Sequence, residues 1–384
     1  MDSGTDAHSL DRTPAVPRPE GCDRIALVLQ GGGALGSYQA GVYQALHQAG
    51  LEPEWIDGIS IGGINAAIIA GNPPELRLKR LTEFWEGVTA LPVNLPKPEG
   101  DLAGALYTAW SSLFTAAFGQ PGFFSPRVPS PLLTPRGARG ATSFYDNTPL
   151  RATLERLVDF DRINRREVRF AVGAVNVETG NLFYFDNETT MIGPEHILAT
   201  SALPPGMPMV QVGSDWFWDG GVVSNTPLQH LLSHAGRLSM LVFQVDLFNA
   251  RGDVPRDMLD VINRQKEIQY SSRTRLVTDY YAIQQKQKRH LRCLLNKIPE
   301  DQLSLEEKVL KEELEVLPSF TILHLIRREA GFQWQIRDFE FSAASMREHW
   351  EAGYRDTRAT LMHKEWMRVP LDGGRLVVHD VHRN

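Results

Sequence analysis

The stretch LVLQGGGALG, residues 27–36, decides the fold because it joins a buried strand to a glycine-rich turn that opens a helix. The helix expected over residues 37–49 would present Tyr38, Val42, Leu46 and Ala49 on one apolar face. Backbone N–H groups lack partners at the start of a helix, where the helix dipole is positive. The stretch therefore predicts a strand–turn–helix unit whose turn can stabilise negative charge.

A second turn between a strand and a helix follows at GISIG, residues 58–62, with Ser60 at its centre. Such a turn bends sharply, and a Cβ atom at Gly58 or Gly62 would meet the neighbouring strand or helix. The bend would push the hydroxyl of Ser60 outward, as a nucleophile requires. Taken alone, however, the pattern is also typical of a serine that caps a helix.

The glycines of the first turn allow a different interpretation. Gly31, Gly33 and Gly36 fit the dinucleotide-binding pattern G-x-G-x-x-G after a strand, and Glu52 or Glu54 lies roughly where a ribose-binding acid is needed. A dinucleotide-binding reductase is therefore one alternative, and a lipid-binding protein without enzymatic activity is another.

A third motif, WFWDGGVVSNTP at residues 216–227, decides between these interpretations. It predicts a short aromatic strand that ends in Asp219, where Gly220 and Gly221 leave the carboxylate uncrowded. A glycine-rich loop, then Gly-x-Ser-x-Gly, then Asp-Gly-Gly, in this order, resembles the patatin-like phospholipases. The similarity runs from about residue 24 to about residue 245 and includes the segments 199–205 and 225–228.

This resemblance implies a three-layer α/β/α domain with a mostly parallel central sheet, joined to a smaller, mainly helical C-terminal unit. It makes Ser60 the nucleophile, Asp219 its base, and the N–H groups around Gly31, Gly32 and Gly33 the oxyanion hole, with a lipid ester as substrate and no cofactor or metal. The glycines that support the motifs are Gly36, Gly58, Gly62, Gly220 and Gly221. One departure is Leu35, where many family members carry arginine or lysine.

A carboxylate alone is a weak base toward serine, so a Ser–Asp pair needs help from its surroundings. Burial would raise the proton affinity of the carboxylate, and each well-placed oxyanion donor supplies on the order of 3 to 4 kcal/mol. His230 and His234 follow Asp219 in the order of an α/β-hydrolase triad, but both are expected on a helix and are interpreted as structural. They are not expected to bind a metal, since Leu231 stands where the metalloprotease motif needs glutamate.

Composition sets further limits. The 384 residues are 42% hydrophobic and 22% charged, as in globular proteins, and the net charge of −6 argues against nucleic acid as a general partner. Two distant cysteines indicate a reducing, cytoplasmic location. No apolar run reaches the roughly 18 residues that span a bilayer, so contact with a membrane would be peripheral.

The chain divides by composition into three parts. We expect a disordered tail at 1–22, the hydrolase domain at 23–250 and a mainly helical extension at 251–384, whose expected role is structural or oligomer-forming. A long insertion at 92–140 is interpreted as a lid, and the uncharged helix expected at 105–118 fits either a lipid contact or a core helix. Other expected elements are helices at 147–158, 255–295, 303–317 and 342–362 and strands at 168–175, 182–185, 241–246 and 321–326.

Overall fold

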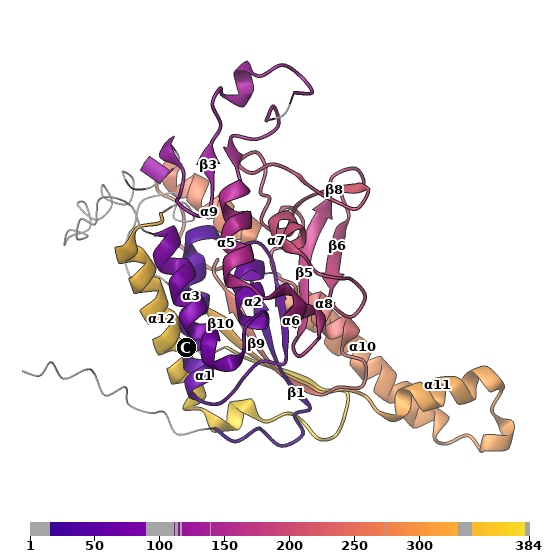
Figure 1. Ribbon diagram of the computed structural model, residues 1–384. Helices are drawn as coiled ribbons and strands as arrows, with labels where there is room; N and C mark the ends of the chain where they lie inside the picture. The colour runs from indigo at the N-terminus through magenta and orange to yellow at the C-terminus, as the bar shows by residue number, and fades with distance from the viewer. Residues whose placement is uncertain are drawn as a thin grey trace, which may run out of the picture.

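The computed structural model describes residues 16–89, 111, 114–115, 117–138, 140–272, 274–328 and 340–380. Within them, nine strands form one sheet in the order β11-β10-β9-β1-β2-β5-β8-β7, with β6 also paired to β5 (Figure 1). The strands are β1 (Arg24–Leu29), β2 (Trp55–Gly58), β5 (Arg169–Asn176), β6 (Leu182–Asp186), β7 (Val210–Val212), β8 (Asp215–Asp219), β9 (Met240–Asp246), β10 (Phe320–Ile326) and β11 (Leu376–Asp380). From β11 to β5 the neighbouring strands run parallel, whereas β6, β7 and β8 are antiparallel to their partners.

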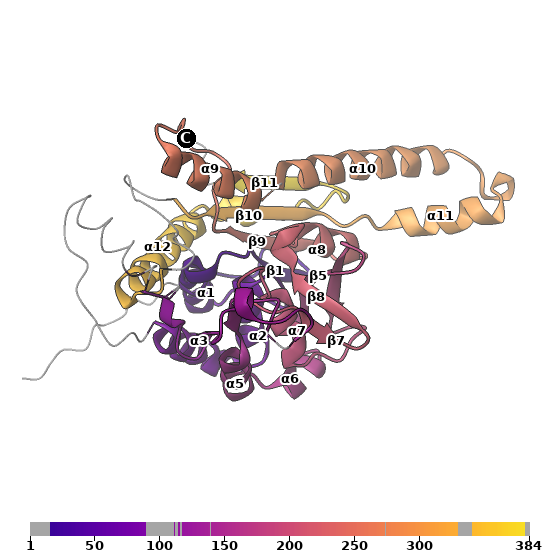
Figure 2. The same cartoon turned by 90° about the horizontal axis from the view of Figure 1, so that it is seen from above.

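Helices cover both faces of this sheet, because its parallel strands carry apolar side chains on both sides. Leu27 and Leu29 of β1 join the larger core, whereas Ala26 and Val28 join the smaller one on the opposite face. The larger core contains helices α1 (Ser37–Gln48), α2 (Ile61–Ala70), α3 (Pro74–Val88), α5 (Thr148–Leu157), α6 (Phe160–Asn164), α7 (Pro194–Thr200) and α12 (Ala343–Leu361). The smaller core contains α8 (Leu228–His234) and residues of α10 (Thr274–Leu295), so the α/β/α layers expected from the sequence are confirmed (Figure 2).

The C-terminal part of the chain is mostly helical, but it also gives β10 and β11 to the sheet. Helix α12 packs against α1 at very close range, since a Cβ atom on Gly41 or Gly353 would strike the backbone of the other helix. The Tyr38 hydroxyl donates to Asp356 across this contact at 2.8 Å. The single helix expected at 255–295 is two helices, α9 (Met258–Tyr270) and α10, and α10 forms a projecting arm with α11 (Leu305–Glu315) (Figures 1 and 2).

Parts of two sequence interpretations lie outside the described residues. Of the tail expected at 1–22, residues 1–15 are outside, whereas Val16 donates its N–H to Ala49 at 2.9 Å. Most of the helix expected at 105–118 is also outside, as are residues 92–104 of the insertion. The described part of the insertion contains β3 (Ser125–Pro126) and the 3₁₀ helix η2 (Pro131–Leu133), and β3 pairs with β4 (Tyr145–Asp146), which follows the insertion. None of the helices in the described residues is long and apolar enough to cross a membrane.

Candidate functional site

Ser60 occupies a strained turn between β2 and α2. Its backbone has φ 55° and ψ −126°, a conformation that residues other than glycine rarely adopt and that concentrates at functional sites. A Cβ atom on Gly58 would come within 2.5 Å of the Gly62 backbone, so the turn needs glycine there. The Ser60 N–H donates to Thr200 Oγ1 at 3.1 Å, and this hydroxyl donates to the Gly173 carbonyl at 2.6 Å. Thr200, to which the sequence analysis gave no role, thus fixes the turn against β5.

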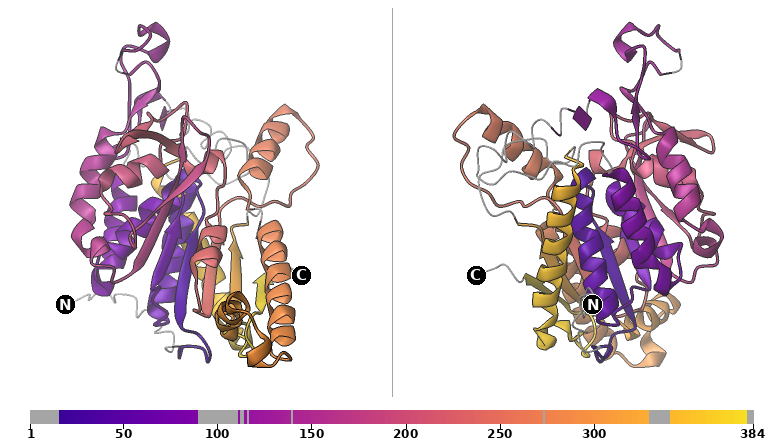
Figure 3. Two further views of the ribbon diagram at one scale, coloured as in Figure 1. Left: turned by 90° about the vertical axis from the view of Figure 1, so that its right-hand side faces the viewer. Right: turned by 60° about the vertical axis from the view of Figure 1, so that its left-hand side comes forward.

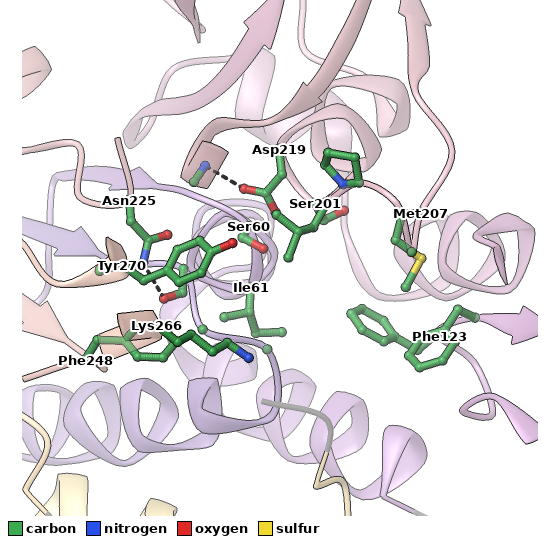
Figure 4. Close-up of a pocket in the computed structure, with 18 of the residues that line it drawn as sticks. Ser60, Ile61, Phe123, Ser201, Met207, Asp219, Asn225, Phe248, Lys266 and Tyr270 are labelled. Atoms are coloured by element: carbon green, nitrogen blue, oxygen red, sulfur yellow. Dashed lines mark hydrogen bonds between the residues drawn. The ribbon is translucent and has the colours of Figure 1, made fainter. Parts of the chain in front are cut away.

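The strand register explains why Asp219 comes to the same place. Strand β6 occupies one edge of β5, so β2 and β8 share the other edge. Gly58 at the end of β2 lies opposite Val172, and Asp219 at the end of β8 lies opposite Ala174. Since only Gly173 lies between these two positions on β5, the end of β8 meets the turn that follows β2. The carboxylate of Asp219 and the hydroxyl of Ser60 face each other there (Figure 4).

Asp219 is 1% exposed, and its carboxylate has an unusually high pKa. Burial raises its pKa from 3.8 to about 7, against the smaller lowering effects of hydrogen bonds from Ser60 and from the Gly221 N–H. Oδ1 accepts that N–H at 2.7 Å. Oδ2 has no partner at good hydrogen-bond geometry among the described residues, although the Ser60 side chain is close enough to lower the pKa. The carboxylate is therefore poised to gain a proton near neutral pH.

The glycine-rich loop supplies unpaired amides, but not the three that the sequence led us to expect. Gly31 donates its N–H to the Asn225 carbonyl at 3.2 Å, which corrects its expected role as an oxyanion donor. In this way it ties the loop to the segment after Asp219. Among the described residues, the N–H groups of Gly32 and Gly33 have no recorded acceptor, nor does that of Ile61 at the start of α2. The sequence analysis did not identify the unpaired N–H of Ile61.

These groups share a cavity of about 270 Å³ with mostly apolar walls. Its floor holds Ser60, Asp219 and the glycine-rich loop, and its walls come from the insertion, from the segment after α7 and from the C-terminal part of the chain (Figure 4). The wall residues include Phe123, Phe124, Leu203, Pro204, Pro205, Met207, Phe248, Lys266, Tyr270 and Phe341. The C-terminal part, for which the sequence indicated no chemistry, therefore helps to form the site.

Gln30 connects the glycine-rich loop to this C-terminal part. The side-chain oxygen of Gln30 accepts the N–H groups of Leu247 and Phe248 at 2.6 and 3.0 Å. Its side-chain nitrogen donates to the Tyr270 carbonyl at 3.0 Å, and Asn225 donates to the same carbonyl at 3.0 Å. One fully buried amide thus joins the ends of β1, β9 and α9 beside the cavity.

The two histidines are engaged away from this cavity. Nδ1 of His230 lies 2.8 Å from Asp57 Oδ2, Nε2 lies 3.7 Å from Asp186, and the ring stacks on Tyr184. His234 bonds through Nδ1 to the His230 carbonyl at 2.9 Å. Both belong to α8 on the opposite side of the sheet from α2. Neither lines the cavity, and no cluster of three or more metal-binding side chains occurs in the described part of the chain.

The two acids that the dinucleotide interpretation needs, Glu52 and Glu54, do not lie beside the glycine-rich loop. Glu54 precedes β2, whose opposite end carries the Ser60 turn, and Glu52 lies two residues further back. Because β1 and β2 are parallel, both acids lie at the amino edge of the sheet, whereas the glycine-rich loop lies at the carboxyl edge. Glu52 pairs instead with His47 and with Arg77, the latter at 2.6 Å. A ribose bound beside the glycines would be out of reach of these carboxylates.

Comparison with known proteins adds an independent finding. Residues 27–232, which include both Ser60 and Asp219, match the family model described as patatin-like phospholipase. Residues 268–372 match a second model, described as patatin phospholipase. No protein with curated function matches the chain. Among solved structures, VipD from Legionella pneumophila matches with 16% sequence identity and a TM-score of 0.38, over 88% of this chain and 67% of that one.

Proposed function

Because this chain belongs to the patatin-like phospholipases, we propose that it is a lipid acyl hydrolase in which Ser60 is the nucleophile and Asp219 is the base. The observation that carries this proposal is the Ser60 side chain beside the buried Oδ2 of Asp219, at the floor of an apolar cavity that also holds unpaired amides. The strained turn at Ser60 and the raised pKa of Asp219 support the proposal, because backbone strain and perturbed pKa values are enriched at functional sites.

In the acylation step, the Ser60 oxygen attacks the ester carbonyl while Oδ2 of Asp219 takes the hydroxyl proton. With a pKa of about 7, about half of the carboxylate is ionised at neutral pH, and it is more basic than an ordinary aspartate. The N–H groups of Gly32, Gly33 and Ile61 are available to the oxyanion of the tetrahedral intermediate. The alcohol leaves with the proton from Asp219, and the acyl group stays on Ser60.

Deacylation repeats this step with water as the nucleophile. Asp219 accepts a proton from the water molecule as its oxygen attacks the acyl carbon, and then returns the proton to Ser60 as the fatty acid leaves. The cavity walls suit this cycle, because Phe123, Phe124, Met207 and Phe341 give an acyl chain an apolar surface. No resident metal or cofactor is required by the proposed steps.

Covalent labelling tests the proposal directly. A fluorophosphonate probe should label Ser60 and should not label the Ser60→Ala protein. Ser201→Ala is a matched control, because Ser201 also lines the cavity but donates to the Ile197 carbonyl at 2.8 Å. Labelling that persists in Ser60→Ala would falsify the assignment. A folded parent protein that binds lipid but turns over no ester would support the non-enzymatic alternative.

We also propose that the enzyme contacts lipid surfaces through the tip of its insertion. Val128, Leu132 and Leu133 are 92%, 82% and 79% exposed, and residues 117–145 contain no aspartate or glutamate. This tip rises above the carboxyl edge of the sheet on one side of the molecule, and α9 rises on the other (Figure 3). Burying these side chains in an acyl layer would remove their apolar surface from water.

Liposome sedimentation checks this contact. Leu132→Asp combined with Leu133→Asp should reduce the bound fraction several-fold, whereas Leu276→Asp on α10, at a leucine that is 67% exposed, should not. Equal binding by both variants would contradict the contact. The two unpaired cysteines, Cys22 and Cys293, agree with the cytoplasmic location that we propose.

A further inference from the structure

Helix α9 carries apolar side chains on the face that is exposed to water. Among the described side chains of this helix, the exposed ones recur at the spacing of a single helical face, and none is charged. They form the outer face of α9, which consists of Met258, Val261, Ile262, Gln265, Ile268 and Gln269. The half-buried side chains include all four charged residues of the helix, Asp260, Arg264, Lys266 and Glu267. This is the reverse of an ordinary surface helix, whose charged face meets water.

Polar contacts outside this face attach α9 to the rest of the protein. Arg264 donates to the Asn249 carbonyl at 3.3 Å. At the end of the helix, the Tyr270 carbonyl accepts hydrogen bonds from Gln30 and Asn225, each at 3.0 Å. The outer face takes no part in these contacts. Since contiguous exposed apolar surface is typical of interaction sites, the outer face indicates a partner that has apolar surface of its own.

The position of the outer face favours a lipid layer as this partner. Helix α9 and the tip of the insertion rise on opposite sides of the same end of the molecule (Figure 3). The cavity that holds Ser60 lies between them, because Phe123 and Phe124 of the insertion and Tyr270 of α9 line its walls. The tip also exposes apolar side chains. A partner that touches both sides must therefore span the space above the cavity, and a lipid layer can do so while it supplies the substrate.

We propose that the outer face of α9 inserts into the surface of a lipid layer, opposite the tip of the insertion, and so turns the cavity toward that layer. This inference adds a second contact to the one at the tip, and it rests on the proposed hydrolase function for the nature of the partner. Amphipathic helices lie in the plane of a bilayer, with the apolar face buried about 5 to 10 Å deep beside the head groups. With lipid held on both sides of the cavity, a lipid ester can enter the cavity without crossing open water.

Vesicle sedimentation compares two matched pairs of substitutions. The vesicles contain equal amounts of phosphatidylcholine and phosphatidylglycerol, and every protein carries Ser60→Ala so that no lipid is hydrolysed. Ile262→Asp with Ile268→Asp should weaken binding about tenfold, because a carboxylate resists burial among acyl chains. The control is Ile283→Asp with Leu294→Asp on α10, at side chains that are 57% and 59% exposed against 56% and 58% for the α9 pair. Unchanged binding by the α9 pair, or an equal loss in both pairs, overturns the proposal.

A fluorescent label reports whether α9 itself enters the lipid. In a Cys293→Ser background, Gln265→Cys places an accessible thiol in the middle of the outer face, since Cys22 is buried. The control is the protein labelled at its own Cys293, which is exposed on α10. With vesicles, the emission of a nitrobenzoxadiazole label at position 265 should shift to shorter wavelength and be quenched by lipids that carry a nitroxide on the acyl chain. The label at Cys293 should show neither change. An unshifted signal at position 265 overturns the proposal.

Analytical ultracentrifugation without lipid tests a second copy of the chain as the partner. A dimer that Ile262→Asp with Ile268→Asp converts to a monomer would assign the outer face to that second copy and overturn the lipid contact, whereas a monomeric parent supports it. None of these measurements requires ester turnover. They therefore test the docking of α9 even if Ser60 is not the nucleophile, and fluorophosphonate labelling of the parent protein tests the hydrolase separately.

Discussion

Replacing the proposed base should make the protein more stable as well as inactive. Because burial raises the pKa of Asp219 from 3.8 to about 7, the ionised carboxylate opposes folding, and this cost is greatest above pH 7. A rise of about three pH units at about 1.4 kcal/mol each corresponds to about 4 kcal/mol at pH 8. In the Asp219→Asn variant, the side-chain amide oxygen can still accept the Gly221 N–H, but the side chain carries no charge. We therefore expect Asp219→Asn to be about 2 to 4 kcal/mol more stable than the parent at pH 8.

The sign of the pH dependence makes this prediction specific. As the pH falls through 7 toward 3.8, Asp219 gains a proton in the folded protein and its cost disappears, so the advantage of Asp219→Asn should shrink by about 2.5 kcal/mol between pH 8 and pH 5. Urea unfolding at several pH values measures both quantities. Asp246→Asn is a contrasting control, because Asp246 pairs with buried His324 at 2.5 Å and its loss should destabilise the fold. An Asp219→Asn protein that is less stable than the parent at pH 8, or whose advantage does not depend on pH, would refute the reasoning.

Three further outcomes are expected. For a neutral ester, kcat/KM should fall about tenfold per pH unit below an apparent pKa near 7, since the base must be ionised; a flat profile between pH 5 and pH 8 would exclude this carboxylate as the base. Thr200→Val removes the acceptor of the Ser60 N–H and should lower kcat about tenfold with little change in KM, whereas Thr200→Ser should keep most of the activity in a steady-state assay; equal kinetics in Thr200→Val would show that the hydrogen bond is dispensable. His230→Gln breaks a buried pair with Asp57 and should destabilise the fold by about 3 kcal/mol in urea unfolding, yet folded protein should still react with fluorophosphonate at the parental rate; loss of labelling in folded protein would restore a catalytic role for the histidine.

Local sequence was sufficient to predict those helices and strands whose formation depends on neighbouring residues in the chain. Helices α1, α5 and α12 and strands β5, β6, β9 and β10 lie within a residue or two of their expected bounds, because their apolar periodicity and caps are local signals. Strand β11 was not foreseen, since its residues are only partly buried at the sheet edge. The break between α9 and α10 was also missed, because the segment is helical and basic on both sides of it.

The candidate site divides in the same way. Glycine-bracketed Ser60 and the Asp-Gly-Gly motif identify the chemistry, because a sharp turn and an uncrowded carboxylate require particular residue types at fixed spacing. Two hydrogen bonds at the site join residues that are far apart in the chain. The Gly31 N–H donates to the Asn225 carbonyl, and the Ser60 N–H donates to the Thr200 hydroxyl. No local pattern encodes such partners.

The sequence by itself thus determined the layers of the fold and the identity of the reacting groups, since propensities, caps and glycine geometry act over a few residues. Only the tertiary structure decided that β8 ends against the turn after β2 and that His230 contacts Asp57 instead of Ser60. It also decided that Lys266 of α9 lines the cavity. These arrangements depend on strand order and on packing between distant segments. Their free energies come from burial and hydrogen bonds that exist only once the whole sheet has formed.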